Sequence, residues 1–456
     1  MLRVYISVAI HRLKSTWNDH PIRMINVLLL IACLVVGWLL YTGKFYGAHE
    51  DLAHLSPLSA PTEWDFLLNH YKNNFRIDFA IWFVPWRFLV KLFQLTPETF
   101  PWWLPISFNL FCISAAPVNL VASLKNLIPS FSKKSLASFI VFLWAIWTIT
   151  PIAFGMTLFI PVAFTSNYAK TLYVLSVACH LWSQPKLSSW VEKLLLAILY
   201  ADLMLYFVSL PTALVLFVGL SILKVWSHQD SFRILFKQIL VGIAITGLAL
   251  ILIFKTSDFY VQSQRDYNVS VPSASSIVQK FYRPIPFGYA TFPHFADDNS
   301  GVRPWHKTDW PFLFAIKSTY SSDRSFVLIH IGLLAILACS LCILFFGYVK
   351  RFGLRDNASL PHVRRLLATL LISLIYAGAF HSSTVFYFFT PHFPQYVKAL
   401  PTLLVTISWS CFIFALIQIS DSQVRQQITA IWQAETDMSS VVSIQHNSSE
   451  RAVVLL

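Results

Sequence analysis

Long apolar runs recur along this chain and are separated by polar or charged stretches. Because a helix crosses a bilayer with roughly 20 predominantly apolar residues, each run is a candidate membrane span. The fourth to sixth runs are short, which allows them to tilt or to pair within the membrane. The pattern predicts an all-α polytopic membrane protein with about ten transmembrane helices, at residues 25–41, 103–123, 136–155, 169–183, 192–208, 209–224, 235–254, 326–348, 366–389 and 397–419.

Composition agrees with a membrane protein. Only 12% of the residues are charged and 56% are hydrophobic, whereas soluble domains carry about 25% charged residues. The first apolar run lacks a small-residue cleavage site and follows a long basic segment. We therefore expect it to be an uncleaved first helix and not a secretory signal.

Basic residues predict which side of the membrane each loop faces, since Lys and Arg accumulate in cytoplasmic loops. With the N-terminus inside, most of the basic excess falls on the cytoplasmic side, and the short loop 350–365 alone holds five basic residues. We expect both termini to be cytoplasmic. The same bias accounts for the net charge of +13, so no nucleic-acid partner is required.

This topology divides the chain into five parts. Residues 1–24 form a cytoplasmic N-terminus, 25–254 hold spans one to seven, 255–325 form a second large outer loop, 326–419 hold spans eight to ten, and 420–456 form a cytoplasmic tail. The first outer loop, 42–102, contains two helical pieces, 62–73 and 77–95. Arg87 and Lys91 interrupt the apolar face of the second, which predicts an interfacial helix. A short transmembrane helix is the alternative.

The first outer loop also carries the strongest candidate chemistry. The adjacent carboxylates Glu50 and Asp51 can accept a proton from a hydroxyl nucleophile. Lys or Arg side chains can hold a phosphate leaving group, Arg by a bidentate fork. The pair can equally be a solvated loop charge, or a ligand of a divalent cation. The cations that follow it are Lys72, Arg76, Arg87 and Lys91.

Charged residues elsewhere are weaker candidates. In the second outer loop, Arg283, Arg303 and Lys307 can contact a phosphate or an anionic acceptor, or can be solvated loop charges. Asp202 falls within the fifth span, where a charge is costly and often functional. A structural role, with Tyr200 or Tyr206 as its partner, is equally open.

Several segments resemble glycosyltransferases of the GT-C fold. The first outer loop is similar in the run His49–Asp51, in Trp64–Asn74, in Arg76–Leu89 and in the prolines 101 and 105 that open the next span. The closest likeness is to bacterial enzymes that decorate O-antigen, including the Gtr-type serotype-converting glucosyltransferases. Thr165–Tyr168 looks like their Asn-containing outer loop. Gln395–Tyr396 stands where relatives often have Arg-Tyr, and Lys398 lies nearby as a cation.

The resemblance implies transfer of a sugar, expected to be glucose, from a polyprenyl-phosphate donor to a surface glycan on the periplasmic face of the bacterial inner membrane. It makes Glu50 or Asp51 the catalytic base. It implies no certain cofactor. A divalent cation is possible, because the acidic pair could bind one. Implied partners are a small flippase and a donor-synthesising glycosyltransferase. The resemblance places the donor on Arg76, Arg87, Lys91, Asn167, Tyr396 and Lys398, with Arg283, Arg303 and Lys307 as further contacts.

Two other functions stay open at this point. An O-antigen polymerase or ligase would act through its late outer loops, here through Arg283 and Arg303. A lipid or solute transporter would need charges along a midplane path and usually two related halves. Asp202 is the one clear ionisable residue deep in a predicted span, and the two halves of the sequence do not match.

Overall fold

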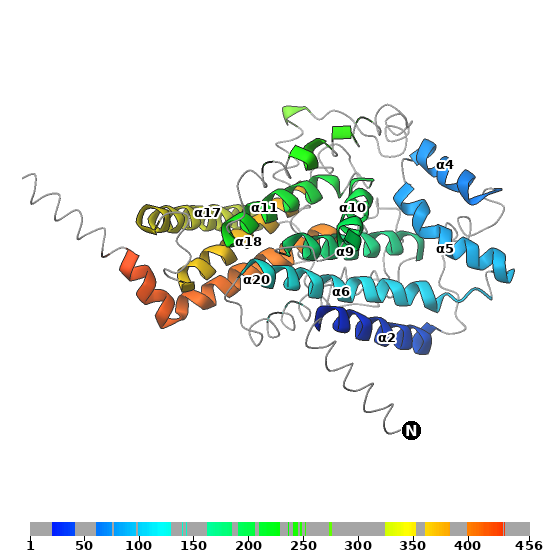
Figure 1. Cartoon of the computed structure of the whole chain (residues 1–456), viewed down its shortest axis with the longest axis horizontal. Helices are drawn as coiled ribbons and strands as arrows, with labels where there is room; N and C mark the ends of the chain where they lie inside the picture. Colours follow the sequence, from blue (N-terminus) through cyan, green and yellow to red (C-terminus); the bar gives the residue numbers. More distant parts are fainter. Residues whose placement is uncertain are drawn as a thin grey trace, which may run out of the picture.

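A computed structural model describes residues 21–41, 61–74, 77–96, 99–128, 162–184, 190–205, 209–228, 324–352, 361–383 and 399–431, together with short pieces at 139, 143, 236, 240–244, 247–248, 251, 273–275 and 433. Within these ranges every regular element is a helix (Figure 1). They are α2 (Pro21–Tyr41), α4 (Glu63–Asn74), α5 (Ile77–Phe93), α6 (Trp103–Leu127), α9 (Val162–Ser183), α10 (Trp190–Leu205), α11 (Leu210–His228), α17 (Arg324–Phe352), α18 (Pro361–Ser383) and α20 (Ala399–Ser420).

Three of these helices are long and apolar enough to cross a membrane, over Ile22–Leu39, Trp103–Leu127 and His362–Phe380. Shorter apolar helical stretches are Leu210–Trp226, Ala338–Lys350 and Thr406–Ser420. The helical bundle and its membrane character therefore agree with the apolar pattern. The full set of about ten spans stays a prediction, because the third and seventh runs lie largely outside the described residues.

α2 and α6 pack antiparallel along their whole length. Near the start of α2, Asn26 Nδ2 donates to Asn119 Oδ1 at 2.8 Å. Towards its other end, Gly37 lies against the first turns of α6. A Cβ at Gly37 would overlap the Ser107 hydroxyl and would come within 3.1 Å of the Trp103 carbonyl oxygen. Glycine is therefore required there for the two backbones to approach.

α6 and α9, by contrast, run parallel. Asn119 Nδ2 lies 3.4 Å from Ser176 Oγ, and Asn126 Nδ2 lies 3.0 Å from Ser183 Oγ, with 57 positions between the partners in both cases. A constant separation is possible only if the two helices point the same way. The end of α6 and the start of α9 therefore lie at opposite ends of this helix pair.

α18 is the centre of the second half of the bundle and packs antiparallel against α20 and α11. Ser373 and Ser408 exchange hydroxyl-to-carbonyl hydrogen bonds at 2.8 and 2.9 Å across α18 and α20. On the other side, a Cβ at Gly219 of α11 would lie 2.6 Å from the Ile375 side chain. Small and hydroxyl-bearing residues thus allow close approach in the interior, as is usual for membrane helices.

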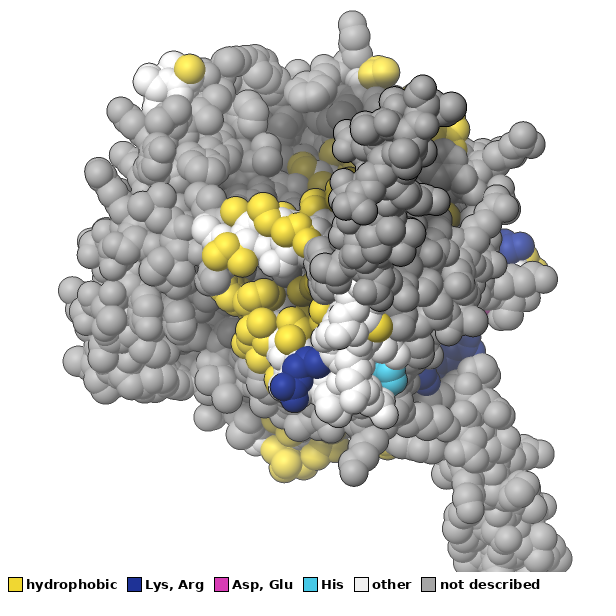
Figure 2. Space-filling view, turned by 90° about the vertical axis from the view of Figure 1, so that its left-hand side faces the viewer, with side chains coloured by type: hydrophobic (Ala, Val, Ile, Leu, Met, Phe, Trp, Pro, Cys, Tyr) yellow, Lys and Arg dark blue, Asp and Glu magenta, His cyan; other side chains and the backbone are white. Residues whose placement is uncertain are grey.

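These pairings bring cationic helix ends together at one end of the bundle, which we call the basic end. The starts of α2 and α10 meet there through Arg23 and Glu192 (2.8 Å). Arg364 at the start of α18 donates to the Trp226 carbonyl of α11 at 2.5 Å. Figure 2, which looks onto the left-hand side of Figure 1, shows Lys and Arg side chains among apolar ones on this face. Cations at this end are Arg23, Lys125, Lys193, Lys224, Arg364 and Arg365.

A further helical stretch, residues 422–431, packs at the basic end after α20. Its apolar residues Val424 and Ile431 are buried. Gln427 Oε1 accepts the backbone N–H groups of His362 and Val363 at 3.1 and 3.2 Å. Those N–H groups lie in the first turn of α18 and have no partner within the helix, so the side chain acts as an external cap.

Candidate functional site

The candidate site lies in the first outer loop, where α4 and α5 gather at the end opposite the basic end (Figure 1). α4 begins with a reciprocal cap. The Asp65 N–H donates to Thr62 Oγ1 at 3.0 Å, and Asp65 Oδ2 accepts the Thr62 N–H at 3.2 Å. This is the capping-box arrangement, with Asp in place of Glu. It places Glu63 in the first turn of α4, where a carboxylate also complements the helix dipole.

Glu63 is the centre of a charged cluster that joins the two helices. Arg87 Nε lies 2.8 Å from one of its carboxylate oxygens, and Lys91 Nζ lies 2.5 Å from the other. Arg87 and Lys91 are four residues apart on α5, so they share one helix face. Two cations against one carboxylate leave this trio with a net single positive charge.

Burial separates the roles of the two cations. The Arg87 side chain is fully buried, and its guanidinium stacks 4.2 Å above the Phe66 ring. The Lys91 side chain keeps 34% of its surface exposed. Arg87 therefore anchors α5 to α4 through a charge pair and a cation–π contact. Lys91 is the cation of this cluster that a bound anion can reach from the protein surface.

The pKa of Glu63 reflects this competition. Burial by itself would raise the pKa of the carboxyl group. Hydrogen bonds from Lys91 and Arg87, together with their positive charges, outweigh burial and hold the pKa below its ordinary value of 4.5. Glu63 is therefore ionised at neutral pH and does not act as a proton acceptor there.

An aromatic cluster fixes α4 and α5 against the start of α6. Phe66, Phe83 and Trp86 are buried together with Trp102 and Ile106. The Trp86 and Phe108 rings meet edge-to-face with centroids 5.8 Å apart. Such contacts position the charged cluster rigidly relative to the membrane helices.

The far face of α5 is apolar and exposed. Ile81, Phe88, Leu92 and Phe93 each expose about half of their surface or more. A helix with one packed face and one open apolar face suits a position in the membrane interface. The helix predicted for residues 77–95 is confirmed and ends two residues earlier, at Phe93, and its position in the membrane interface stays a prediction.

A second ion pair lies at the same end of the bundle. Lys170 Nζ of α9 is 2.9 Å from Asp202 Oδ1 of α10, and both side chains are largely buried. α5 touches both of these helices. The sequence suggests Tyr200 or Tyr206 as the partner of Asp202; the structure gives it Lys170, and Tyr206 lies outside the described residues. Lys170 was missed because it lies 32 positions away on another helix.

Most of the predicted site residues lie outside the described part of the chain. These are the acidic pair, one cation of the first outer loop, and the cations and aromatic residue of the later loops: Glu50, Asp51, Arg76, Arg283, Arg303, Lys307, Tyr396 and Lys398. Where the structure describes side chains, no three His, Cys, Asp or Glu residues gather as metal ligands. Binding of a divalent cation by Glu50 and Asp51 stays a prediction.

The expected outer loop at Thr165–Tyr168 is wrong. α9 begins at Val162 and therefore includes these four residues. Pro161 directly precedes the helix, and proline is favoured at helix starts. Asn167 is consequently on a helix, at the same end of the bundle as Lys170.

No protein-family model, curated protein or solved structure matches this chain. A functional assignment therefore rests on the residues themselves.

Proposed function

We propose that this protein is a membrane glycosyltransferase that moves a sugar from a polyprenyl-phosphate donor to a surface glycan. The observation that carries the proposal is the cluster Glu63–Arg87–Lys91. It joins α4 to α5 and leaves Lys91 partly exposed. The exposed apolar face of α5 suits a position in the membrane interface. A lipid phosphate is the anion most available at that position.

Orientation supports an outer-face reaction. Cations concentrate at the basic end, and Lys and Arg favour the cytoplasmic side of membrane proteins. The opposite end, with α4, α5 and the Lys170–Asp202 pair, then faces the periplasm of a bacterial inner membrane. A polyprenyl-phosphate sugar that has been flipped across the membrane presents its sugar on that side, which is the role expected of the small flippase.

In the proposed reaction, a hydroxyl oxygen of the acceptor glycan attacks the anomeric carbon of the donor sugar. The bond from that carbon to the phosphate oxygen breaks, and polyprenyl phosphate leaves with the electron pair. Glu50 or Asp51 takes the proton of the hydroxyl. Lys91 neutralises the departing phosphate, while Arg87 keeps Glu63 and α4 in place. The exposed apolar residues of α5 lie alongside the polyprenyl chain.

Transfer of labelled glucose from polyprenyl-phosphate glucose to an acceptor glycan, by the full chain in liposomes, tests this function. Glu50→Ala with Asp51→Ala should lower kcat by about 100-fold or more, the usual contribution of a general base. Lys91→Gln should raise the donor KM, whereas Lys125→Gln at the basic end serves as a matched control and should not. Full activity in a correctly inserted double variant would refute the mechanism.

The same assay distinguishes a polymerase or ligase, which would extend or transfer whole oligosaccharides. In that case substitution of Arg283 and Arg303 would abolish activity and substitution of Glu50 and Asp51 would not.

One observation favours a second candidate, a transporter. The Lys170–Asp202 pair lies between two apolar helices, as coupling residues in transporters do. Uptake of a lipid or solute by reconstituted vesicles, lost in Asp202→Asn, would support transport over glycosyl transfer.

A further inference from the structure

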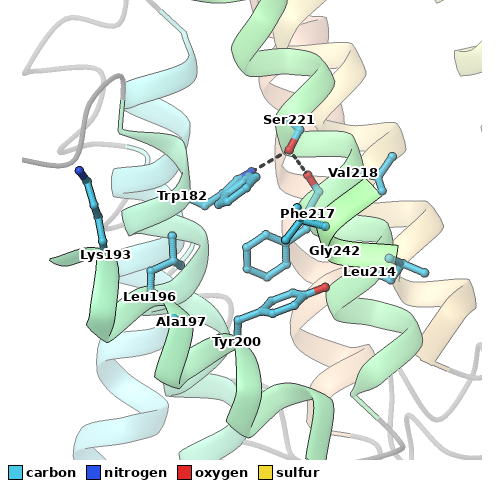
Figure 3. Close-up of a pocket in the computed structure, with 11 residues that line it drawn as sticks. Trp182, Lys193, Leu196, Ala197, Tyr200, Leu214, Phe217, Val218, Ser221 and Gly242 are labelled. Atoms are coloured by element: carbon cyan, nitrogen blue, oxygen red, sulfur yellow. Dashed lines mark hydrogen bonds between the residues drawn. The ribbon is translucent and has the colours of Figure 1, made fainter. Parts of the chain in front are cut away.

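A largely apolar pocket of about 200 Å³ lies between α9, α10, α11 and the helical residues 241–242 (Figure 3). Its walls include Leu196, Tyr200, Leu214, Phe217, Val218 and Val241. The Tyr200 and Phe217 rings meet edge-to-face at 4.5 Å and form its floor. An apolar cavity of roughly 150 Å³ is large enough to bind benzene. This pocket can therefore take the end of a hydrocarbon chain.

The Trp182 indole N–H and the Ser221 hydroxyl in the walls already have partners. Trp182 Nε1 donates to Ser221 Oγ at 2.9 Å, and Ser221 Oγ donates to the Phe217 carbonyl at 2.6 Å (Figure 3). The interior consequently presents little to a polar ligand. An occupant must be apolar where it enters the pocket.

A cation stands at the rim. Figure 3 shows Lys193 beside the pocket, with its ammonium group directed away from the aromatic rings. Its neighbour Glu192 is paired with Arg23. Among the described residues, no carboxylate forms an ion pair with Lys193. The rim therefore offers a positive charge to the polar end of an occupant.

The helix faces around the pocket are apolar and exposed. On α10 these are Leu194, Leu195 and Ile198, and on the neighbouring segment Leu240 and Ile243. In a membrane protein such faces contact lipid chains. Lys193 lies near the start of α10, at the basic end, where lipid head groups meet the chains.

We propose that this pocket binds an anionic phospholipid, with one acyl chain between α10 and α11 and the head-group phosphate on Lys193. Charge complementarity selects an anionic lipid over a zwitterionic one, and the apolar walls select a chain over a free phosphate. The head-group site on Lys193 lies at the opposite end of the bundle from Glu63 and Lys91, and the pocket extends from it along α10 as far as Tyr200. It is therefore separate from the proposed sugar donor and does not depend on glycosyl transfer.

Photolabelling of the purified full chain in nanodiscs tests this site. The probes are phosphatidylglycerol and phosphatidylcholine, each with a diazirine at the end of an acyl chain, and labelled peptides are mapped by mass spectrometry. Phosphatidylglycerol should label peptides of α10 and α11 about fivefold more than phosphatidylcholine. Lys193→Gln should remove this preference, and Lys193→Arg should keep it.

Two glycine substitutions separate pocket binding from general contact with lipid. A Cβ at Gly242 would lie at an ordinary 3.5 Å from the Tyr200 hydroxyl, so Gly242→Leu fills the pocket without a clash at its Cβ. Gly247 has nothing within 4 Å of its Cβ position, so Gly247→Leu is a matched control. We expect loss of labelling in Gly242→Leu alone. Equal labelling by the two lipids, or unchanged labelling in Gly242→Leu, would overturn the proposal.

Discussion

The Nε atom of Arg87 lies 2.8 Å from a carboxylate oxygen of Glu63, and the whole Arg87 side chain is buried. A buried guanidinium is tolerable only while its charge is balanced and its hydrogen bonds are made. This relationship makes the fold of the first outer loop depend on one carboxylate.

Glu63→Gln should therefore destabilise the protein by about 2 kcal/mol, because it removes the carboxylate that Arg87 Nε meets at 2.8 Å while the guanidinium stays buried. That figure is below the range for fully buried pairs, since the carboxylate is partly exposed. Lys91→Gln removes a more exposed partner and should cost less than about 1 kcal/mol. Thermal unfolding in detergent measures both, and equal effects would contradict the assigned roles of the two cations.

The lowered pKa of Glu63 predicts how this stabilisation varies with pH. The ionised carboxylate is favoured in the folded state, so its contribution is fully present above the ordinary value of 4.5. It is lost as the pH falls through the lower pKa of the folded state. Unfolding temperatures of the wild type and Glu63→Gln should differ most near pH 7 and converge in acid. A gap that widened below pH 4.5 would reverse this sign.

The Lys170–Asp202 pair should behave as a unit. Asp202→Asn removes the carboxylate that Lys170 Nζ meets at 2.9 Å between two helices, which should cost about 3 kcal/mol. Lys170→Met combined with Asp202→Leu removes both charges and should cost less than either single change. Unfolding midpoints of Lys170→Met, Asp202→Leu and the double variant provide the test, and simple additivity would show that the pair is not coupled.

Parallel packing of α6 and α9 predicts a pattern of cross-links. In a background without the six native cysteines, Asn119→Cys with Ser176→Cys and Asn126→Cys with Ser183→Cys should each be joined by a short bifunctional reagent. The mixed pair Asn119→Cys with Ser183→Cys should not react, because its positions lie at different heights along the helices. A reactive mixed pair with unreactive matched pairs would indicate antiparallel helices.

Close packing at Gly219 predicts a steric penalty. Gly219→Ala would place a Cβ 2.6 Å from the Ile375 side chain and should destabilise by about 1–3 kcal/mol. Ile375→Ala in the same chain should recover part of that loss. Gly332→Ala, at a helical position with nothing within 4 Å, should be neutral or slightly stabilising. Unfolding midpoints distinguish these outcomes.

Helix positions were largely predictable because apolar run length is a local property. The runs 103–123 and 397–419 correspond to α6 (Trp103–Leu127) and α20 (Ala399–Ser420) within a few residues. The boundary before the fourth run was not predicted, since Thr165–Tyr168 is polar enough to resemble a loop.

The charged contacts were not predictable in the same way. Arg87 and Lys91 were recognised from the sequence as a cationic pair, but Glu63 lies 24 positions from Arg87. The capping box at Thr62–Asp65 places Glu63 in a first turn and carries no information about its partner. Ion pairs between helices depend on tertiary packing, which a single sequence does not reveal.

The parallel arrangement of α6 and α9 has a consequence for biosynthesis. Asn119 and Asn126 are synthesised before Ser176 and Ser183. Their side-chain amides therefore lack these hydroxyl partners until α9 has been made and inserted. During this interval we expect α6 to stay at the insertion machinery, because release into lipid would expose its polar groups to the hydrocarbon. Truncated nascent chains that end before α9 should therefore be preferred clients of membrane quality-control proteases.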